Sequence, residues 1–100
     1  MNKVVYNTKY GLFGLSEKAV KMYCKLKGLK TSAYLNIDKI VRHDPILIQI
    51  VEELGTKANG PYANLSIAEI EGDRYRISEY DGVERVITPE MDAEKYIKID

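Results

Sequence analysis

Residues 74–88, with the sequence RYRISEYDGVERVIT, decide the fold class of this chain. Tyr75 and Ile77 alternate with polar neighbours, and a period of two residues is typical of a β-strand. The dipeptide Asp81-Gly82 then predicts a hairpin turn, because both central positions of a type I′ turn need a positive φ. Val83–Thr88 forms the returning strand of that hairpin.

The same alternation extends upstream of the hairpin. Leu65 and Ile67 alternate with polar or small side chains, and Gly72-Asp73 interrupts the run. Residues 63–88 therefore predict a three-stranded antiparallel meander. Alternation in residues 95–99 favours a final strand.

Two helices are predicted from the residues that begin and end them. Ser16 is a good N-cap and Gly28 a good stop for the first helix, and Asp44-Pro45 and Gly55 bound the second. Six of the nine residues 46–54 are Ile, Leu or Val. We therefore expect the second helix to be buried on most sides and to form the centre of the core.

Two further strands complete the expected order of elements. The β-branched pair Val4-Val5 predicts a strand over residues 3–7, and alternating apolar side chains predict another over residues 32–41. The order β-α-β-α followed by a meander indicates the α+β class. A chain of 100 residues is expected to form a single domain, residues 1–100.

The formal net charge is zero, but the charges are unevenly distributed along the chain. Residues 1–30 carry seven Lys and one Glu, a net charge of +6, and residues 31–100 carry −6. If the two regions lie on separate faces the molecule is dipolar, and self-association that weakens at high salt is expected. A small domain with strand edges to cover is also expected to form homo-oligomers.

Composition excludes several classes of protein. No apolar run approaches the roughly 20 residues that span a bilayer, so we expect no membrane partner. Cys24 is the only cysteine, which excludes a disulfide within the chain and a Cys-rich zinc site. No signal-peptide pattern follows Met1, and a reducing cytosol fits best. We expect no metal and no cofactor.

His43 is the only histidine and the obvious acid–base candidate, because imidazole titrates near neutral pH. Its neighbour Asp44 already has a role as a helix cap, so a structural role for His43 at the strand-to-helix corner is favoured and no catalytic residue is assigned. The alternative is a small enzyme that uses His43 with a carboxylate, such as Asp81 or Glu84, or that uses Cys24.

The aromatic composition favours a binding role. The chain has eight Tyr and no Trp, and tyrosine is enriched at interfaces and in ligand pockets. Aromatic rings stack on bases, and arginines pair with phosphates. The expected ligand-binding residues combine such rings with polar donors and are Tyr34, Asn36, Arg42, His43, Arg74, Arg76 and Tyr80.

A lysine face on the first helix provides an alternative binding hypothesis. Lys18, Lys21 and Lys25 fall on the side opposite the apolar residues, where they can contact nucleic-acid phosphates. The chain has no net charge and no nucleic-acid-reading motif, so a nucleic-acid or nucleoprotein partner is not favoured.

Several stretches of the chain share a pattern with known proteins. They are Val4-Val5-Tyr6-Asn7 with Tyr10-Gly11-x-Phe13-Gly14-Leu15-Ser16, Arg42-His43-Asp44-Pro45-x-Leu47, Val51-Glu52-Glu53-Leu54-Gly55 with Ala58-Asn59-Gly60, and Tyr75-x-Ile77-x-Glu79-Tyr80-Asp81-Gly82-x-Glu84. The set resembles a family of small, mostly uncharacterised proteins encoded by tailed bacteriophages and prophages. The resemblance spans most of the chain and implies no particular activity or catalytic residue.

The resemblance implies expression in the cytoplasm of a bacterial host during infection. Small phage accessory proteins are often anti-defence factors, including inhibitors and sponges for cyclic-nucleotide signals, which is an analogy from genome context. We therefore expect a non-enzymatic protein that inhibits or sequesters a bacterial host defence protein or a small nucleotide signal.

Overall fold

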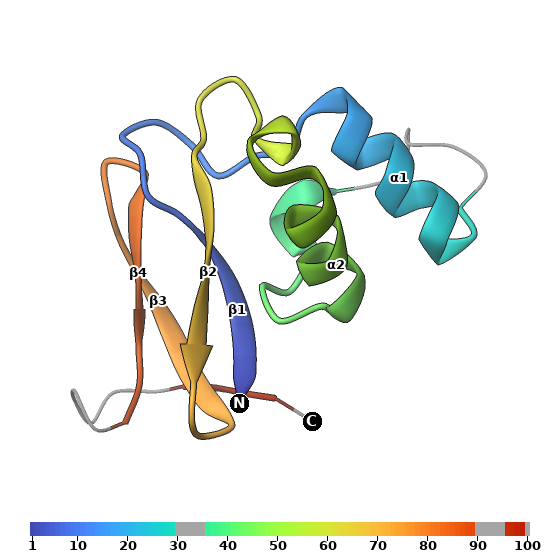
Figure 1. Cartoon of the computed structure of the whole chain (residues 1–100). Helices are drawn as coiled ribbons and strands as arrows, with labels where there is room; N and C mark the ends of the chain where they lie inside the picture. Colours follow the sequence, from blue (N-terminus) through green and yellow to red (C-terminus); the bar gives the residue numbers. More distant parts are fainter. Residues whose placement is uncertain (30–35, 90–95, 100) are drawn as a thin grey trace.

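The computed structural model describes residues 1–29, 36–89 and 96–99. In chain order its elements are β1 (Asn2–Asn7), α1 (Glu17–Lys27), η2 (Ile37–Lys39), α2 (Pro45–Leu54), η3 (Gly55–Ala58), β2 (Leu65–Ile70), β3 (Arg74–Tyr80), β4 (Val83–Ile87) and β5 (Ile97–Lys98), where η marks a 3-10 helix. Figure 1 shows three layers, with β3 and β4 on one side of the pair β1 and β2 and the helices on the other.

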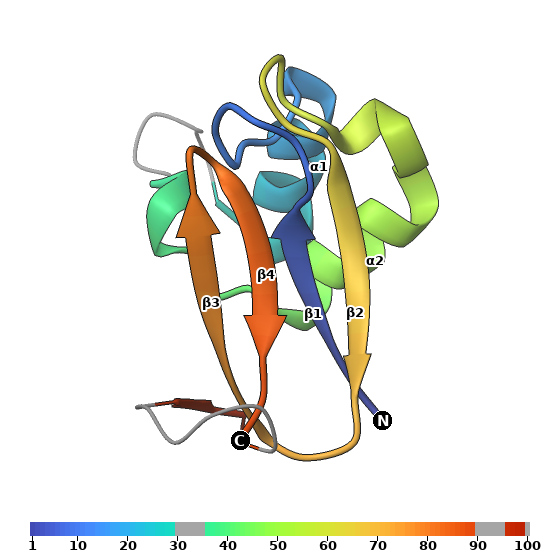
Figure 2. The ribbon, with the colours of Figure 1, turned by 90° about the vertical axis from the view of Figure 1, so that its left-hand side faces the viewer.

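The α+β class is confirmed, but the strand pairing differs from the expected meander. The three strands predicted within residues 63–88 are present, and β3 and β4 form the predicted antiparallel hairpin. β2, however, pairs antiparallel with β1 along its whole length, and β3 takes the short final strand β5 as its other neighbour. The prediction of one three-stranded sheet is therefore wrong, as Figure 2 shows from the side of β3 and β4.

Side-chain packing explains why β2 joins β1. Leu65 and Ile67 of β2 pack with Val5 of β1 against the helices. On the other side of the same two strands, Ile70 packs with the buried Tyr75 of β3. β1 and β2 thus separate two apolar clusters. If β2 paired with β3 instead, the helices would lose the apolar surface that Leu65 and Ile67 provide for them.

Both predicted helices form between the expected residues. The Ser16 side chain accepts a hydrogen bond from the Ala19 N–H at the start of α1, and Gly28 ends that helix in the left-handed conformation. Asp44 caps α2 in the same way through the Ile46 N–H. These ends form as predicted because a cap depends only on residues close to it in the chain.

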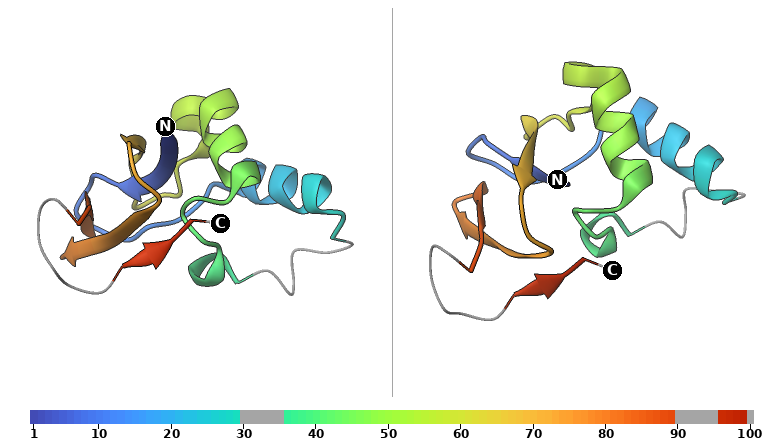
Figure 3. Two further views of the ribbon diagram at one scale, coloured as in Figure 1. Left: turned by 90° about the horizontal axis from the view of Figure 1, so that it is seen from below. Right: turned by 60° about the horizontal axis from the view of Figure 1, so that its bottom comes forward.

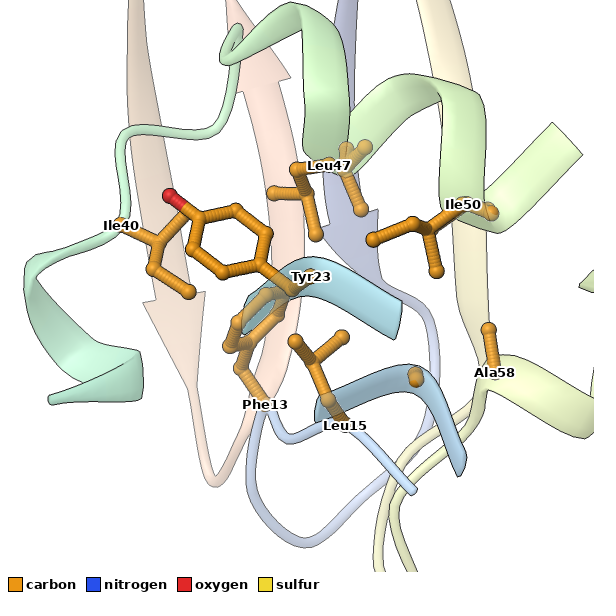
Figure 4. Close-up of a cluster of buried hydrophobic side chains, with 10 residues drawn as sticks. Phe13, Leu15, Tyr23, Ile40, Leu47, Ile50 and Ala58 are labelled. Carbon is orange, nitrogen blue, oxygen red and sulfur yellow. The ribbon is translucent and has the colours of Figure 1, made fainter. Parts of the chain in front are cut away.

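The expectation that α2 is buried on most sides is wrong. Leu47, Ile50 and Val51 are buried on one face, whereas Ile46 and Ile48 are half-buried. That face packs in the larger apolar cluster, where Figure 4 shows Leu47 and Ile50 beside Tyr23, Phe13 and Leu15. Side chains on the opposite face, including Glu52 and Glu53, are exposed.

The predicted strand over residues 32–41 is wrong in the part that the structure describes, and residues 30–35 lie outside it. Ile37–Lys39 forms the 3-10 helix η2. The Asn36 side chain accepts a hydrogen bond from the Asp38 N–H, so a local turn replaces the extended backbone. This capping competes with strand formation in a way that alternation of side chains does not reveal.

A buried ion pair joins β4 to the corner that precedes α2. Both terminal nitrogens of the Arg42 guanidinium donate to the carboxylate of Glu84, which is only 7% exposed. The same carboxylate accepts the backbone N–H of Asn7, at the end of β1, at 2.8 Å. Glu84 therefore ties β1, β4 and the Arg42 corner together.

We predict that the Arg42→Ala substitution destabilises the fold by about 3–5 kcal/mol, because it leaves the Glu84 carboxylate buried without its counter-ion. Urea unfolding measures this change. The matched control is Arg85→Ala, which removes an exposed arginine next to Glu84 on the same strand and is expected to cost less than about 0.5 kcal/mol. Equal effects of the two substitutions would contradict the structural role of the pair.

Candidate functional site

The expected ligand-binding residues do not converge on one site. Tyr34 lies outside the described residues, and Asn36 is used as the cap of η2. Arg74 is exposed at the start of β3 beside Asp73, whereas Tyr80 is at the far end of the same strand. Arg76 is half-buried on that strand and has interactions of its own.

Arg42 and His43 are neighbours in the chain, but their side chains diverge. The Arg42 guanidinium carbon lies 3.5 Å from the centre of the Phe13 ring while its nitrogens bind Glu84. The Arg42 carbonyl accepts the Val5 N–H at 2.8 Å. The Arg42 guanidinium is thus already engaged by Glu84 and by the Phe13 ring, which makes it unsuited to binding a ligand phosphate.

His43 is oriented by a buried tyrosine. Its Nδ1 lies 2.7 Å from the hydroxyl of Tyr75, and the two rings meet edge to face. Burial raises the pKa of the Tyr75 hydroxyl, an effect that the Arg42 charge and the His43 backbone N–H partly offset. The hydroxyl therefore stays protonated at neutral pH, and when it donates to Nδ1 it assigns the proton of neutral His43 to Nε2.

His43 lines a cleft of about 400 Å³ between the start of β1 and α2. The other lining residues are Met1, Asn2, Lys3, Pro45, Ile48, Glu52 and Ile99. Lys3 Nζ donates to Glu52 at 2.6 Å, and this hydrogen bond raises the pKa of Lys3. The charged side chains of Lys3 and Glu52 in the cleft are thus already paired with each other.

The cleft does not assemble the catalytic groups considered for an enzyme. Cys24 is buried in α1, Glu84 binds Arg42, and Asp81 is exposed in the β3–β4 turn. Among the described residues, neither these three nor any serine or threonine lines the cleft at His43. Among the described residues, no group of three His, Cys, Asp or Glu side chains could hold a metal ion.

A second buried polar cluster lies where α1 meets α2. The hydroxyl of Tyr23 donates to Asp44 at 2.7 Å, and the Lys27 ammonium lies 3.2 Å from the same carboxylate oxygen. Burial works to raise the pKa of Asp44, but the hydrogen bonds from Tyr23, the Ile46 N–H and Lys27 outweigh it and lower that pKa. Burial and the Asp44 carboxylate raise the pKa of Tyr23. This cluster stabilises the packing of α1 against α2, and none of its three side chains lines the His43 cleft.

Three loops meet at the opposite end of the molecule from the His43 cleft. The Gly11 N–H donates to the Asp81 carbonyl, and the Leu12 N–H donates to the Tyr62 carbonyl. The approach is so close that a Cβ on Gly82 would lie 1.9 Å from the Gly11 carbonyl oxygen. Glycine is therefore required at Gly82, where φ is +89°, and at Gly11, where φ is +139°.

Four large side chains are exposed on these loops and at the adjoining end of β3, and we call them the tyrosine end. Tyr10 is 70% exposed, Leu12 and Tyr62 are each 66% exposed, and Tyr80 is 74% exposed. Tyr10 and Tyr80 line one shallow groove of about 230 Å³, together with Ser78, Val83 and Arg85. In Figure 1 the three loops form the upper end of the molecule, above the sheets.

The polar side chain that positions these loops is Asn7, which is fully buried. Its Nδ2 donates to the carbonyls of Lys9 and Gly82, and its Oδ1 accepts the N–H groups of Asn64 and Lys9. All four hydrogen-bonding positions of the amide are occupied, so the side chain fixes the three loops relative to one another.

The predicted lysine face is present on α1. Lys18, Lys21 and Lys25 are exposed, and Lys21 pairs with Glu17 one turn earlier at 3.2 Å. The helix lies in the outer layer, on the opposite side of the molecule from β3 and β4 (Figure 3). Within the described ranges, every helix is too short or too polar to cross a membrane.

The chain matches no protein-family model, no curated protein and no solved structure.

Tyr80 is the only member of the tyrosine end among the expected binding residues. The number of tyrosines indicated a binding surface, but it did not show that Tyr10 and Tyr62 lie at the same end of the molecule as Tyr80. The signal that could have found them is the pair of glycines around them, since Gly11 and Gly60 mark close backbone approaches.

We predict that acid weakens the fold partly through Asp44. Because its pKa is lower in the folded state, its contribution is complete above the unfolded value of about 4 and is lost as the pH falls through the folded pKa. Urea unfolding of the wild type and Asp44→Asn between pH 7 and pH 2 measures this, since asparagine keeps the cap. The stability difference between the two proteins should shrink below about pH 4.

The Tyr23→Phe variant serves as the companion measurement. It removes a hydrogen bond that lowers the pKa of Asp44, so its acid-induced loss of stability should be smaller than that of the wild type. A difference between wild type and Asp44→Asn that stays constant with pH would contradict the assignment.

Proposed function

We propose that this protein is a non-enzymatic binding protein of phage type whose tyrosine end docks on a bacterial host defence protein and inhibits it. The observation that carries the proposal is the exposure of Tyr10, Leu12 and Tyr62 on loops that buried polar groups hold in place, next to Tyr80 at the end of β3. Exposed large apolar groups gathered at one place mark interaction sites.

The chemistry of the tyrosine end suits a protein surface. Tyrosine supplies a rigid ring with a polar end, loses little side-chain entropy on binding, and is enriched among the residues that dominate binding energy. The loops that hold these rings are fixed by Asn7 and by direct backbone contacts, so little ordering remains to be done when a partner binds.

The bacterial context of the proposal comes from the resemblance to phage and prophage proteins. The scattered positions of His43, Cys24 and Glu84 support a function that requires no catalytic group. The lysine face supports a nucleic-acid partner less well, because Lys21 is already paired with Glu17 and the chain carries no net charge.

A small nucleotide signal is the second candidate ligand, and the groove between Tyr10 and Tyr80 favours it. The two exposed rings offer faces on which a base can stack, and Arg85 and Ser78 offer donors for phosphate oxygens. This groove occupies only one side of the tyrosine end, so Tyr62 lies outside it.

We predict that the triple variant Tyr10→Ser, Tyr62→Ser, Tyr80→Ser loses its host partner while keeping its fold, because all three rings are exposed. The test expresses each protein in bacteria whose defence system restricts a phage, and measures plaque formation and the host protein that co-purifies. The wild type should restore plaques and retain one defence protein, and the triple variant should do neither. Lys25→Ser, an exposed change on α1, is the matched control and should behave as the wild type.

Retention of the same defence protein by the triple variant would contradict the tyrosine end as the docking surface. If the wild type restores plaques with none of the defence systems tested, that result would contradict the inhibitory function itself.

For the nucleotide ligand, we predict heat of binding in calorimetry with at least one member of a panel of cyclic dinucleotides, cyclic trinucleotides and ADP-ribose nucleotides. Tyr10→Ala and Arg85→Ala should each weaken that binding at least tenfold, since they remove a stacking face and a phosphate donor. Tyr62→Ala is the matched control and should leave the affinity unchanged. No heat with any member, or equal loss in all three variants, would rule out the groove as a nucleotide site.

A further inference from the structure

Strand β2 presents an open hydrogen-bonding edge. It is a six-residue strand with the sequence LSIAEI, and its only strand partner in the described part of the chain is β1. Natural edge strands are usually protected by lysine, proline or a bulge. β2 contains no proline or glycine, and Glu69 is its one charged residue.

The direction of each backbone group follows from the bonds around β1. The Thr8 N–H donates to the Asn64 carbonyl in continuation of the β1–β2 register, so the even-numbered residues of β2 direct their N–H and C=O groups toward β1. The odd-numbered residues Leu65, Ile67 and Glu69 therefore direct theirs toward the open edge.

The outer side of β1 confirms this alternation. The backbone N–H groups of its odd-numbered residues are directed away from β2. The Val5 N–H donates to the Arg42 carbonyl, and the Asn7 N–H donates to the Glu84 carboxylate. On β2, the Leu65 N–H is taken by the Asn59 side chain at 2.8 Å. The N–H groups of Ile67 and Glu69 have no such partner among the described residues.

We propose that β2 pairs antiparallel with β2 of a second copy of this chain about a two-fold axis at Ile67. Ile67 then exchanges both backbone hydrogen bonds with Ile67 of the second copy, and the Glu69 N–H donates to the Leu65 carbonyl of that copy. The Leu65 N–H needs no partner, since Asn59 already bonds it. Each open N–H of the edge, that of Ile67 and that of Glu69, thus meets a carbonyl of the second copy, as a two-fold interface requires.

The side chains of β2 fit the same register. Ile67 meets its own copy, Ser66 lies opposite Ala68, and Glu69 lies opposite Leu65. The two Glu69 carboxylates are therefore at opposite ends of the contact, and each has Lys3 as its neighbour across β1 and β2. A second copy satisfies this edge without placing like charges together, and the pairing is independent of what the tyrosine end binds.

Sedimentation across a concentration series tests the proposal with the full chain. We expect the wild type to dimerise, and Glu69→Pro to shift the monomer–dimer equilibrium at least tenfold toward the monomer. Proline at this position removes an outward N–H and no bond to β1. Glu69→Ala is the matched control, because it removes the exposed carboxylate but keeps the N–H, and it should dimerise as the wild type does.

Amide hydrogen exchange of the wild type gives a second measurement that needs no variant. In the dimer the Ile67 and Glu69 amides should be protected, and the protection should fall on dilution. A wild type that stays monomeric at about 1 mM, or a folded Glu69→Pro that dimerises unchanged, overturns the proposal. A dimer that dissociates in 1 M NaCl also overturns it, because that result indicates association through the opposed charges of the two halves.

Discussion

The structure depends on one buried carboxylate, that of Glu84. β1 and β4 belong to different sheets, and the bond between them runs from the Asn7 N–H to this side chain instead of through a backbone ladder. Arg42 supplies the counter-charge from the corner before α2. A single carboxylate therefore holds together the hairpin layer, the central strands and the helix layer, and its burial is tolerated because its charge is paired and its oxygens are bonded.

The same interaction sets the geometry of the tyrosine end. Glu84 fixes the backbone of Asn7, and the Asn7 side chain then bonds the loops on either side of it. The β3–β4 turn is thereby pressed against Gly11, where neither glycine of the contact leaves room for a Cβ. A binding surface built on three loops is rigid here because a buried polar network lies directly beneath it. The exposed rings are thus positioned by residues that never contact a ligand.

Local features of the fold could be predicted from the sequence, and long-range ones could not. The caps at Ser16 and Asp44 and the turn at Asp81-Gly82 involve residues a few positions apart, and all three form as predicted. The pairing of β2 with β1 joins segments about 60 residues apart in the chain, and alternation alone does not choose between two possible neighbours. The burial of Glu84 could not be predicted, because nothing near it in sequence shows that Arg42 lies across from it.

The candidate site follows the same division. The abundance of tyrosine indicated a binding surface, and Tyr80 was among the expected residues, but Tyr10 and Tyr62 reach it only through the folding of three separate loops. His43 was expected to help fix a corner, and its hydrogen bond to the buried Tyr75 agrees with that role. Arg42 was expected to bind a ligand and instead carries the central ion pair of the fold.

The rate of hydrogen exchange at the Asn7 amide, measured by NMR, tests the central role of Glu84 most directly. This N–H lies at the end of a strand, next to an exposed loop, and its bond is to a side chain. If Glu84 is the tie between the layers, Asn7 exchanges only on global unfolding, as slowly as the amides of Ile50 and Val51 in the core of α2. Exchange at Asn7 as fast as at the neighbouring exposed Tyr10 would contradict that role.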